Sequence, residues 1–231
     1  SGVCPHQCWS ETMVLQPAIE GLLGFSADAP NRKMTLAPNL PAHWDSLQVS
    51  GIRLENQTID FKFQRKNGLS KYIFHSDSPN KFTLNFNPYF PAGTTIEQVR
   101  LNGQYLPVTL FTSQLAINMF TSFSPEKETI LEIETKGGIS VLPVVQNPKP
   151  GDRAEGTRIV SQSYHRGTYT VVFEGVAGSS DNIQVWSDGK YTTDSENINL
   201  LKETGNLTTY EIIFPASAEK YQQININWKK Y

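Results

Sequence analysis

The chain has 231 residues, of which 38% are hydrophobic and 18% charged, and its formal net charge is −2 at pH 7. This balance is typical of a folded protein of one large or two small domains and excludes an intrinsically disordered chain. A slightly acidic chain lacks the basic face that nucleic-acid binding needs, and no apolar run reaches the roughly 18 residues of a membrane span. We therefore expect neither a nucleic-acid nor a membrane partner.

The first 30 residues are expected to be helical. Apolar side chains recur there at roughly helical spacing, at Trp9, Met13, Ile19, Leu22 and Leu23. Pro17 should kink or restart the helix, and Gly24 is a suitable stop. A single helix this apolar needs a partner surface, so we expect it to be the end of a larger helical unit.

Residues 31–140 are expected to form an antiparallel β-sandwich. Apolar and polar residues alternate with a period of two at Ile59–Phe63, Phe82–Phe86, Leu115–Met119 and Leu131–Ile133. Asn67-Gly68 and Asn102-Gly103 are typical of two-residue hairpin turns, because both central residues of such a turn need positive φ. Short alternating strands separated by turns favour a sandwich.

Residues 141–231 are expected to be a linker and a second, smaller β-sandwich. Pro143, Pro148, Pro150 and Gly151 lie close together, which indicates a semi-rigid connection. Alternation then returns at Tyr169–Phe173, Tyr210–Phe214 and Ile224–Trp228. The predicted fold class is therefore mainly β, with two antiparallel sandwiches after one N-terminal helix.

No motif for catalysis, a cofactor or a metal ion is visible. The sequence has no G-x-S-x-G elbow, no H-E-x-x-H and no dinucleotide fingerprint. Cys4 and Cys8 flank His6, which allows a disulfide, half of a metal site or two ordinary thiols. Acidic residues that could line a calcium loop, but match no EF-hand spacing, are Asp181, Asp188, Asp194 and Glu196. We expect no catalytic residue, no metal and no cofactor.

Exposed aromatic rings are the candidates for sugar contact. Trp186 lies near Asp188 and Tyr191, and Trp44 follows His43. An aromatic face can stack on the apolar face of a sugar, although both tryptophans can equally pack in a core. In the run 182–187, Ile183 and Val185 share one face, so Trp186 points to the other. We therefore predict two candidate sugar platforms, one at Trp186 with Tyr191 and another at Trp44.

Several short motifs resemble one enzyme family. They are P-H-Q-C-W-S (5–10), G-L-L-G (21–24), L-A-P (36–38), L-P-A-H-W (40–44) and V-R-L-N-G (99–103). Together they resemble the end of the catalytic barrel in bacterial (α/α)6-barrel glycoside hydrolases of the glycogen-debranching, amylo-α-1,6-glucosidase-like type, which are related to families 37 and 63. The resemblance covers residues 4–54 and fades after the linker.

The resemblance implies that residues 1–30 hold the last barrel helix and that the chain then crosses into a C-terminal β-sandwich. Such enzymes act with two carboxylates, a general acid and a general base. The base would fall at or before Ser1 and the acid far upstream, and Glu11 does not match, so both would be missing from this chain. Gln7 and Trp9 would contact substrate at the barrel mouth. A periplasmic or cell-surface location is also implied.

Three functions follow as hypotheses. The first is a non-catalytic C-terminal accessory region of a glycoside hydrolase, which braces the barrel and meets oligo- or polysaccharide through the parent enzyme. The second is a free-standing carbohydrate-binding module. The third is a protein-interaction or adhesion β-sandwich, because this architecture hosts many unrelated roles.

Overall fold

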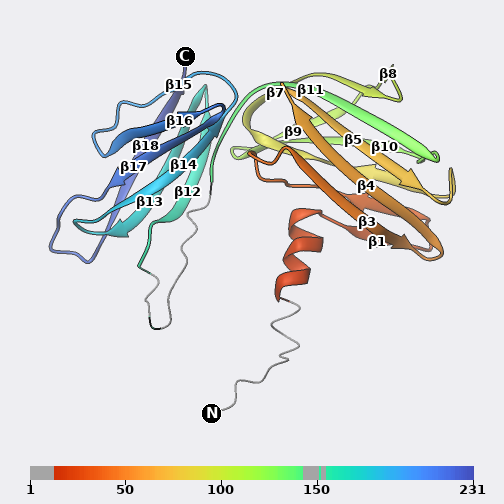
Figure 1. Ribbon diagram of the computed structural model, residues 1–231, viewed down its shortest axis with the longest axis horizontal. Helices are drawn as coiled ribbons and strands as arrows, with labels where there is room; N and C mark the ends of the chain where they lie inside the picture. The colour runs from red at the N-terminus through yellow and green to blue at the C-terminus, as the bar shows by residue number, and fades with distance from the viewer. Residues whose placement is uncertain (1–12, 143–150, 152–154) are drawn as a thin grey trace, which may run out of the picture.

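The computed structural model describes residues 13–142, 151 and 155–231, and the fold is mainly β, as predicted (Figure 1). A helix ends in the π-helical segment η1 (Pro17–Leu22). The strands before the proline-rich connection are β1 (Ser26–Asp28), β2 (Lys33–Leu36), β3 (Ser46–Leu54), β4 (Gln57–Lys66), β5 (Leu69–Ser76), β6 (Thr83–Phe86), β7 (Tyr89–Leu101), β8 (Gln104–Tyr105), β9 (Thr109–Thr112), β10 (Ala116–Phe123) and β11 (Glu128–Val141). Those after it are β12 (Arg158–His165), β13 (Thr168–Val176), β14 (Ser180–Ser187), β15 (Tyr191–Thr192), β16 (Ile198–Thr204), β17 (Leu207–Ile213) and β18 (Tyr221–Lys230).

The helix changes its winding at Pro17 and ends before Gly24. Proline has no N–H to donate, and from Pro17 onward the turns widen, so that the Leu23 N–H reaches the Ala18 carbonyl at 3.2 Å. Gly24 has φ +57°, and a Cβ there would lie 2.5 Å from the Ala37 carbonyl oxygen. The predicted disturbance at Pro17 and stop at Gly24 are both present. Cys4, Cys8, Gln7 and Trp9 lie outside the described residues.

The strands form two sheets that do not separate clearly into two sandwiches. One sheet has 14 strands, and its main path is β1-β2-β6-β10-β7-β11-β14-β17-β16. Strands β5, β4 and β3 branch from β11, while β8 and β9 add to β7 and β10. The second sheet is β12-β13-β18-β15. The expected pair of sandwiches is thus replaced by one large sheet that runs through both halves and a small sheet that belongs to the second half.

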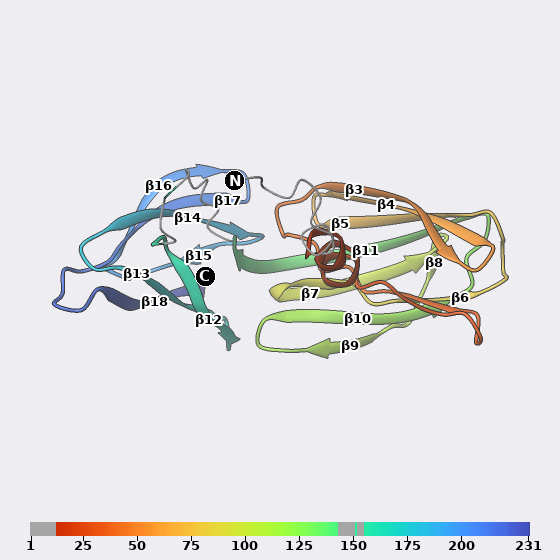
Figure 2. The same cartoon turned by 90° about the horizontal axis from the view of Figure 1, so that it is seen from below.

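Strand β11 joins the two halves. Its residues from Glu128 to Glu134 pair with β5, and its last residues from Ile139 to Val141 pair with β14 on the same edge. Gly137 and Gly138 separate these two stretches and have φ +73° and +109°, conformations that L side chains rarely adopt. We call residues 13–136 the first lobe and residues 139–142 with 155–231 the second lobe. Figure 2 shows β11 passing from one to the other.

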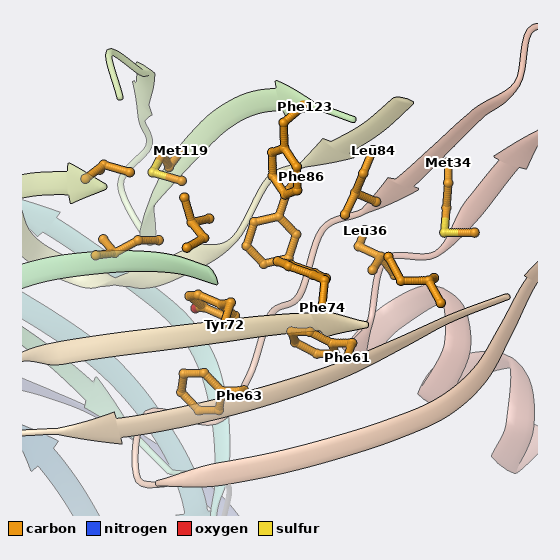
Figure 3. Close-up of a cluster of buried hydrophobic side chains, with 14 of the residues drawn as sticks. Met34, Leu36, Phe61, Phe63, Tyr72, Phe74, Leu84, Phe86, Met119 and Phe123 are labelled. Carbon is orange, nitrogen blue, oxygen red and sulfur yellow. The ribbon is translucent and has the colours of Figure 1, made fainter. Parts of the chain in front are cut away.

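Each lobe has its own cluster of buried side chains. In the first lobe, Phe61 stacks on Phe74 and Phe86 meets Phe74 edge-on, with ring centroids 5.6 and 5.2 Å apart (Figure 3). In the second lobe, Trp228 packs against Tyr169 and Phe173. The alternation read from the sequence predicted these faces, because the odd-numbered apolar residues of β4 and β13 are the buried ones.

Candidate functional site

A cleft of about 290 Å³ lies where the two lobes meet. Its walls come from the β4–β5 hairpin of the first lobe and from the ends of β14 and β16 in the second lobe, and the bend in β7 and β11 lies between them. The lining residues that carry chemistry are Asp45, Arg65, Lys66, Asn67, Thr94, Thr135, Trp186, Asp188 and Asn206.

The first-lobe wall is fixed by the Asn67-Gly68 turn. Both residues have positive φ, as the predicted hairpin turn requires. The Gly68 carbonyl accepts hydrogen bonds from the Thr135 N–H at 2.8 Å and from the Thr135 hydroxyl at 3.1 Å. The turn is thereby tied to β11, which holds Lys66 and Asn67 at the mouth of the cleft.

The second-lobe wall is tied to the same strand at the glycine pair. The Gly137 N–H donates to an Asp188 carboxylate oxygen at 3.0 Å, and the Asp188 N–H donates to the Gly138 carbonyl at 3.0 Å. The Ser187 N–H donates to the Asn206 carbonyl at 2.8 Å, which brings the β16–β17 turn alongside. Both walls are therefore held to β11 by backbone hydrogen bonds, together with the Thr135 hydroxyl and the Asp188 carboxylate.

Trp186 is the aromatic wall of the cleft. It is half-buried, while Ile183 and Val185 on the other face of β14 are buried, which confirms the alternation read from the sequence. A Cβ on Gly138 would lie 3.5 Å from the Trp186 ring and 2.5 Å from the Thr94 hydroxyl oxygen. Only glycine at position 138 lets the indole and this hydroxyl approach the strand so closely.

The charges in the cleft balance. Arg65 and Lys66 supply two positive charges, and Asp45 and Asp188 supply two negative ones. Burial lowers the pKa of the Arg65 guanidinium, which donates to the Ala42 carbonyl at 2.9 Å and to the Ser70 hydroxyl at 3.3 Å. Arg65 is thus committed to the protein, whereas the side chains of Lys66 and Asn206 make no hydrogen bond or ion pair with the described residues.

The other predicted platform residues lie elsewhere. Tyr191 lines a separate cavity of about 400 Å³ with Trp228 and Tyr210, and burial raises its pKa. Trp44 is half-buried, and its N–H donates to the Pro41 carbonyl. Its neighbour Asp45 lines the cleft, whereas Trp44 does not. Trp186 and Tyr191, which were expected in one platform, thus line different cavities, and Trp44 lines neither of them. Whether any of them binds sugar stays a prediction.

The acidic residues considered for calcium do not gather. Asp181 accepts the Thr157 N–H, Asp194 pairs with Lys229 at 3.1 Å, and Asp188 faces Gly137. Among the described residues, no group of three or more His, Cys, Asp or Glu side chains lies close enough to hold a metal ion. His43 and His165 are exposed, and the His75 imidazole lies 3.6 Å from Glu128.

A second candidate surface combines the helix with exposed aromatic side chains of the first lobe. We call it the docking face, and its members are Met13, Val14, Leu15, Ile19, Tyr89, Phe111 and Phe120. Tyr89, Asn118 and Phe111 pair directly across β7, β10 and β9, so they share one side of the sheet, and Phe120 lies two residues beyond Asn118 on that side. These aromatic residues were not among the predicted site residues, although the alternation of Ile117 and Met119 already places Phe120 on the opposite face of its strand.

The helix joins the sheet beside these aromatic residues. The Asn39 N–H donates to the Leu22 carbonyl at 2.9 Å, and the Tyr89 N–H donates to the Pro38 carbonyl at 2.9 Å. The end of the helix is therefore only one chain segment away from Tyr89. Figure 1 shows the helix projecting from the first lobe. In the described part of the chain, no helix has the length and apolar character needed to cross a membrane.

Comparisons with known proteins give only distant likenesses. No protein-family profile and no curated protein sequence matches the chain. Among solved structures, a protein described as a glycoside hydrolase is similar with a TM-score of 0.34 and 10% identity, over 84% of this chain and 35% of that one. A GH127 β-L-arabinofuranosidase from Geobacillus stearothermophilus T6 is similar with a TM-score of 0.33 and 8% identity, over 90% of this chain and 32% of that one.

The chain thus spans about a third of the length of both structures. Both TM-scores are too low to define a shared fold, and neither likeness enters the arguments below.

Proposed function

We propose that this chain is a non-catalytic C-terminal accessory region of a carbohydrate-active enzyme and that its β lobes brace a helical catalytic barrel. The observation that carries the proposal is the docking face. Met13, Val14 and Leu15 are each more than half exposed, although they lie on a helix whose end is bonded to the first lobe. A helix with so much apolar surface in water is typical of one that packs against further helices.

The position of the helix supports this role. Leu22 and Leu23 pack against the core of the first lobe, so the end of the helix is anchored while its body stays uncovered. Phe111 and Phe120, on the same side as Tyr89, add apolar area next to it. An α-helical body seated on this face would cover the helix and the aromatic residues together. Because the sequence of residues 4–54 resembles the end of an (α/α)6 barrel, we infer that this α-helical body is such a barrel.

The first experiment reads the coding sequence upstream of this chain. We expect the reading frame to continue through a long helical-hairpin pattern that contains acidic residues before the P-H-Q motif. A frame that begins close to Ser1, or one that continues into a different kind of domain, would contradict the proposal.

The second experiment tests bracing in the parent protein. Leu15→Asp and Ile19→Asp should lower its melting temperature, because each places a charge in the contact between helix and barrel. Tyr105→Asp is the matched control, because Tyr105 is 70% exposed on the short strand β8 and is not part of the docking face. In the isolated chain all three substitutions should leave stability nearly unchanged, and a large loss there would show that the helix has another role. Turnover of aryl-glycosides by the isolated chain would exclude a non-catalytic region.

A further inference from the structure

We infer that the cleft between the lobes binds a single neutral sugar residue, with Trp186 as the stacking wall. This inference deepens the proposed function by giving the accessory region a ligand site of its own. The sugar site lies in the cleft, whereas the proposed bracing role depends on the docking face. An experiment can therefore disprove either proposal while the other stands.

The size of the cleft favours a small ligand. Its volume of about 290 Å³ is at the lower end of the roughly 300–1,000 Å³ found for small-molecule sites. The walls are tied to β11 by the hydrogen bonds of Thr135, Gly137 and Asp188, so the cleft is formed before a ligand arrives. A preformed site loses little conformational entropy on binding.

The chemistry of the lining fits a polyhydroxylated ring. A pyranose or furanose presents C–H bonds on one face, which can stack on the electron-rich face of the Trp186 indole. Around the tryptophan stand groups that can exchange hydrogen bonds with hydroxyls, namely Lys66, Asn67 and Asn206, whose side chains have no partner among the described residues. An asparagine amide both donates and accepts, so it can bind two vicinal hydroxyls, and the Lys66 ammonium donates.

An unpaired hydroxyl at the floor of the cleft also points to a ligand. Thr94 is only 8% exposed, and its hydroxyl oxygen has no hydrogen-bond partner in the described part of the chain. A buried polar group without a partner destabilises a protein by roughly 1–3 kcal/mol. Thr94 and Trp186 both line the cleft and both approach Gly138, so a ligand or a ligand-bound water molecule in the cleft can supply the missing bond.

The balance of charges excludes a strongly charged ligand. Two cationic side chains face two carboxylates, and both Arg65 and Asp188 already bond to backbone groups of the protein. An anionic sugar would meet the carboxylates as well as the lysine. We therefore expect neutral sugars to bind better than uronic acids.

The test uses the whole chain and ligand-observed saturation-transfer NMR. The probes are the methyl glycosides of glucose, galactose, mannose, xylose, arabinose and rhamnose, with glucuronic acid as the charged comparison, each at about 10 mM, because affinities near the millimolar range are expected for one sugar residue. At least one neutral glycoside should give saturation transfer. No signal from any neutral probe, or a stronger signal from glucuronic acid than from all of them, would overturn the inference.

Variants locate the signal. Trp186→Leu should weaken binding about tenfold through loss of stacking, and Asn206→Ala should weaken it about threefold through loss of one hydrogen bond. Phe111→Leu is the control, because Phe111 is an exposed aromatic residue of the docking face, and it should bind sugar as the unmodified chain does. Circular-dichroism melting confirms that each variant is folded. Binding that survives in folded Trp186→Leu, or that is lost in Phe111→Leu, would place the sugar outside the cleft.

Discussion

The cores of the two lobes differ in where their residues come from. Every buried residue of the first cluster lies between Met34 and Ile133, inside the first lobe. The second cluster includes Ala92 from β7 and both Ile139 and Val141 from the end of β11. The second core thus takes Ala92 from the first lobe and Ile139 and Val141 from the end of a strand that begins in the first lobe, whereas the first core has no buried residue from the second lobe. We therefore expect the second lobe to depend on the first lobe for its stability more than the first depends on the second.

Cutting the chain at the connection should have the largest effect. A fragment of residues 151–231 lacks Ile139 and Val141 and leaves the edge of β14 unpaired, so we expect no cooperative unfolding transition. A fragment of residues 13–142 should fold. Circular-dichroism melting measures both. A fragment of residues 136–231, which restores the end of β11, is the control and should regain part of the transition. Cooperative melting of residues 151–231 would show that the second lobe is independent.

Core substitutions should show the same dependence of the second lobe on the first. Phe74→Ala and Phe173→Ala each remove a fully buried ring and should cost about 3–5 kcal/mol. Phe74→Ala should speed hydrogen exchange in both lobes, while Phe173→Ala should speed it only in the second. Exchange followed by mass spectrometry on peptides from each lobe makes the comparison. Equal effects in both lobes from Phe173→Ala would mean that coupling runs both ways.

The glycine pair at the junction should be less tolerant than a glycine in open space. Gly138→Ala forces an unfavourable φ and places its Cβ 2.5 Å from the Thr94 hydroxyl oxygen, so we expect a loss of about 2–3 kcal/mol. Gly51→Ala has φ +74° but nothing within 4 Å, and should cost only about 1 kcal/mol. Urea titration measures both. Thr94→Ala combined with Gly138→Ala should recover part of the difference, and no recovery would mean that the strain lies in the backbone alone.

Alkaline pH should lower the free energy of unfolding of the second lobe, by less than the substitutions above. Burial raises the pKa of Tyr169 to about 12 from its ordinary value of 10.0. The neutral phenol is therefore favoured in the folded state, and its contribution is complete below pH 10.0 and is lost as pH rises through about 12. Tyr169→Phe should flatten this loss, measured as the urea midpoint across that range. The variant should also lose about 1 kcal/mol at pH 7, because the Val141 N–H bonds to the phenol at 3.3 Å. An unchanged alkaline profile would mean that another group titrates there.

Local patterns predicted much of the fold. The period of two placed Phe61, Phe63 and Ile133 in a core, and the Asn-Gly pairs gave hairpins whose two central residues have positive φ. These features depend on neighbours in the chain, so the sequence carries them directly. The sharing of β11 between the two lobes could not be predicted in this way. In the sequence, Gly137-Gly138 looks like the end of a strand. The residues beyond it pair with β14, which is more than forty residues away in the chain.

The residues of the candidate site were likewise only partly predictable from local patterns in the sequence. Trp186 was singled out because it is aromatic and lies opposite two apolar residues, and the structure places it in the cleft. Arg65, Thr94 and Asn206 carry no motif, and they come together because β5, β7 and β14 all pair with β11. Their proximity follows from long-range pairing, which single-sequence patterns do not record.

Strands β2 and β6 lie parallel in a sheet whose other pairs are antiparallel, with Lys33 beside Thr83. All of β3, β4 and β5 lie between them in the chain. Strand β2 can pair with β1 at once, but at roughly 5–20 residues per second of synthesis several seconds pass before its other neighbour, β6, exists. Strand β2 therefore pairs early with β1 on one edge and late with β6 on the other, and the parallel pair can form only after β3, β4 and β5 have been made.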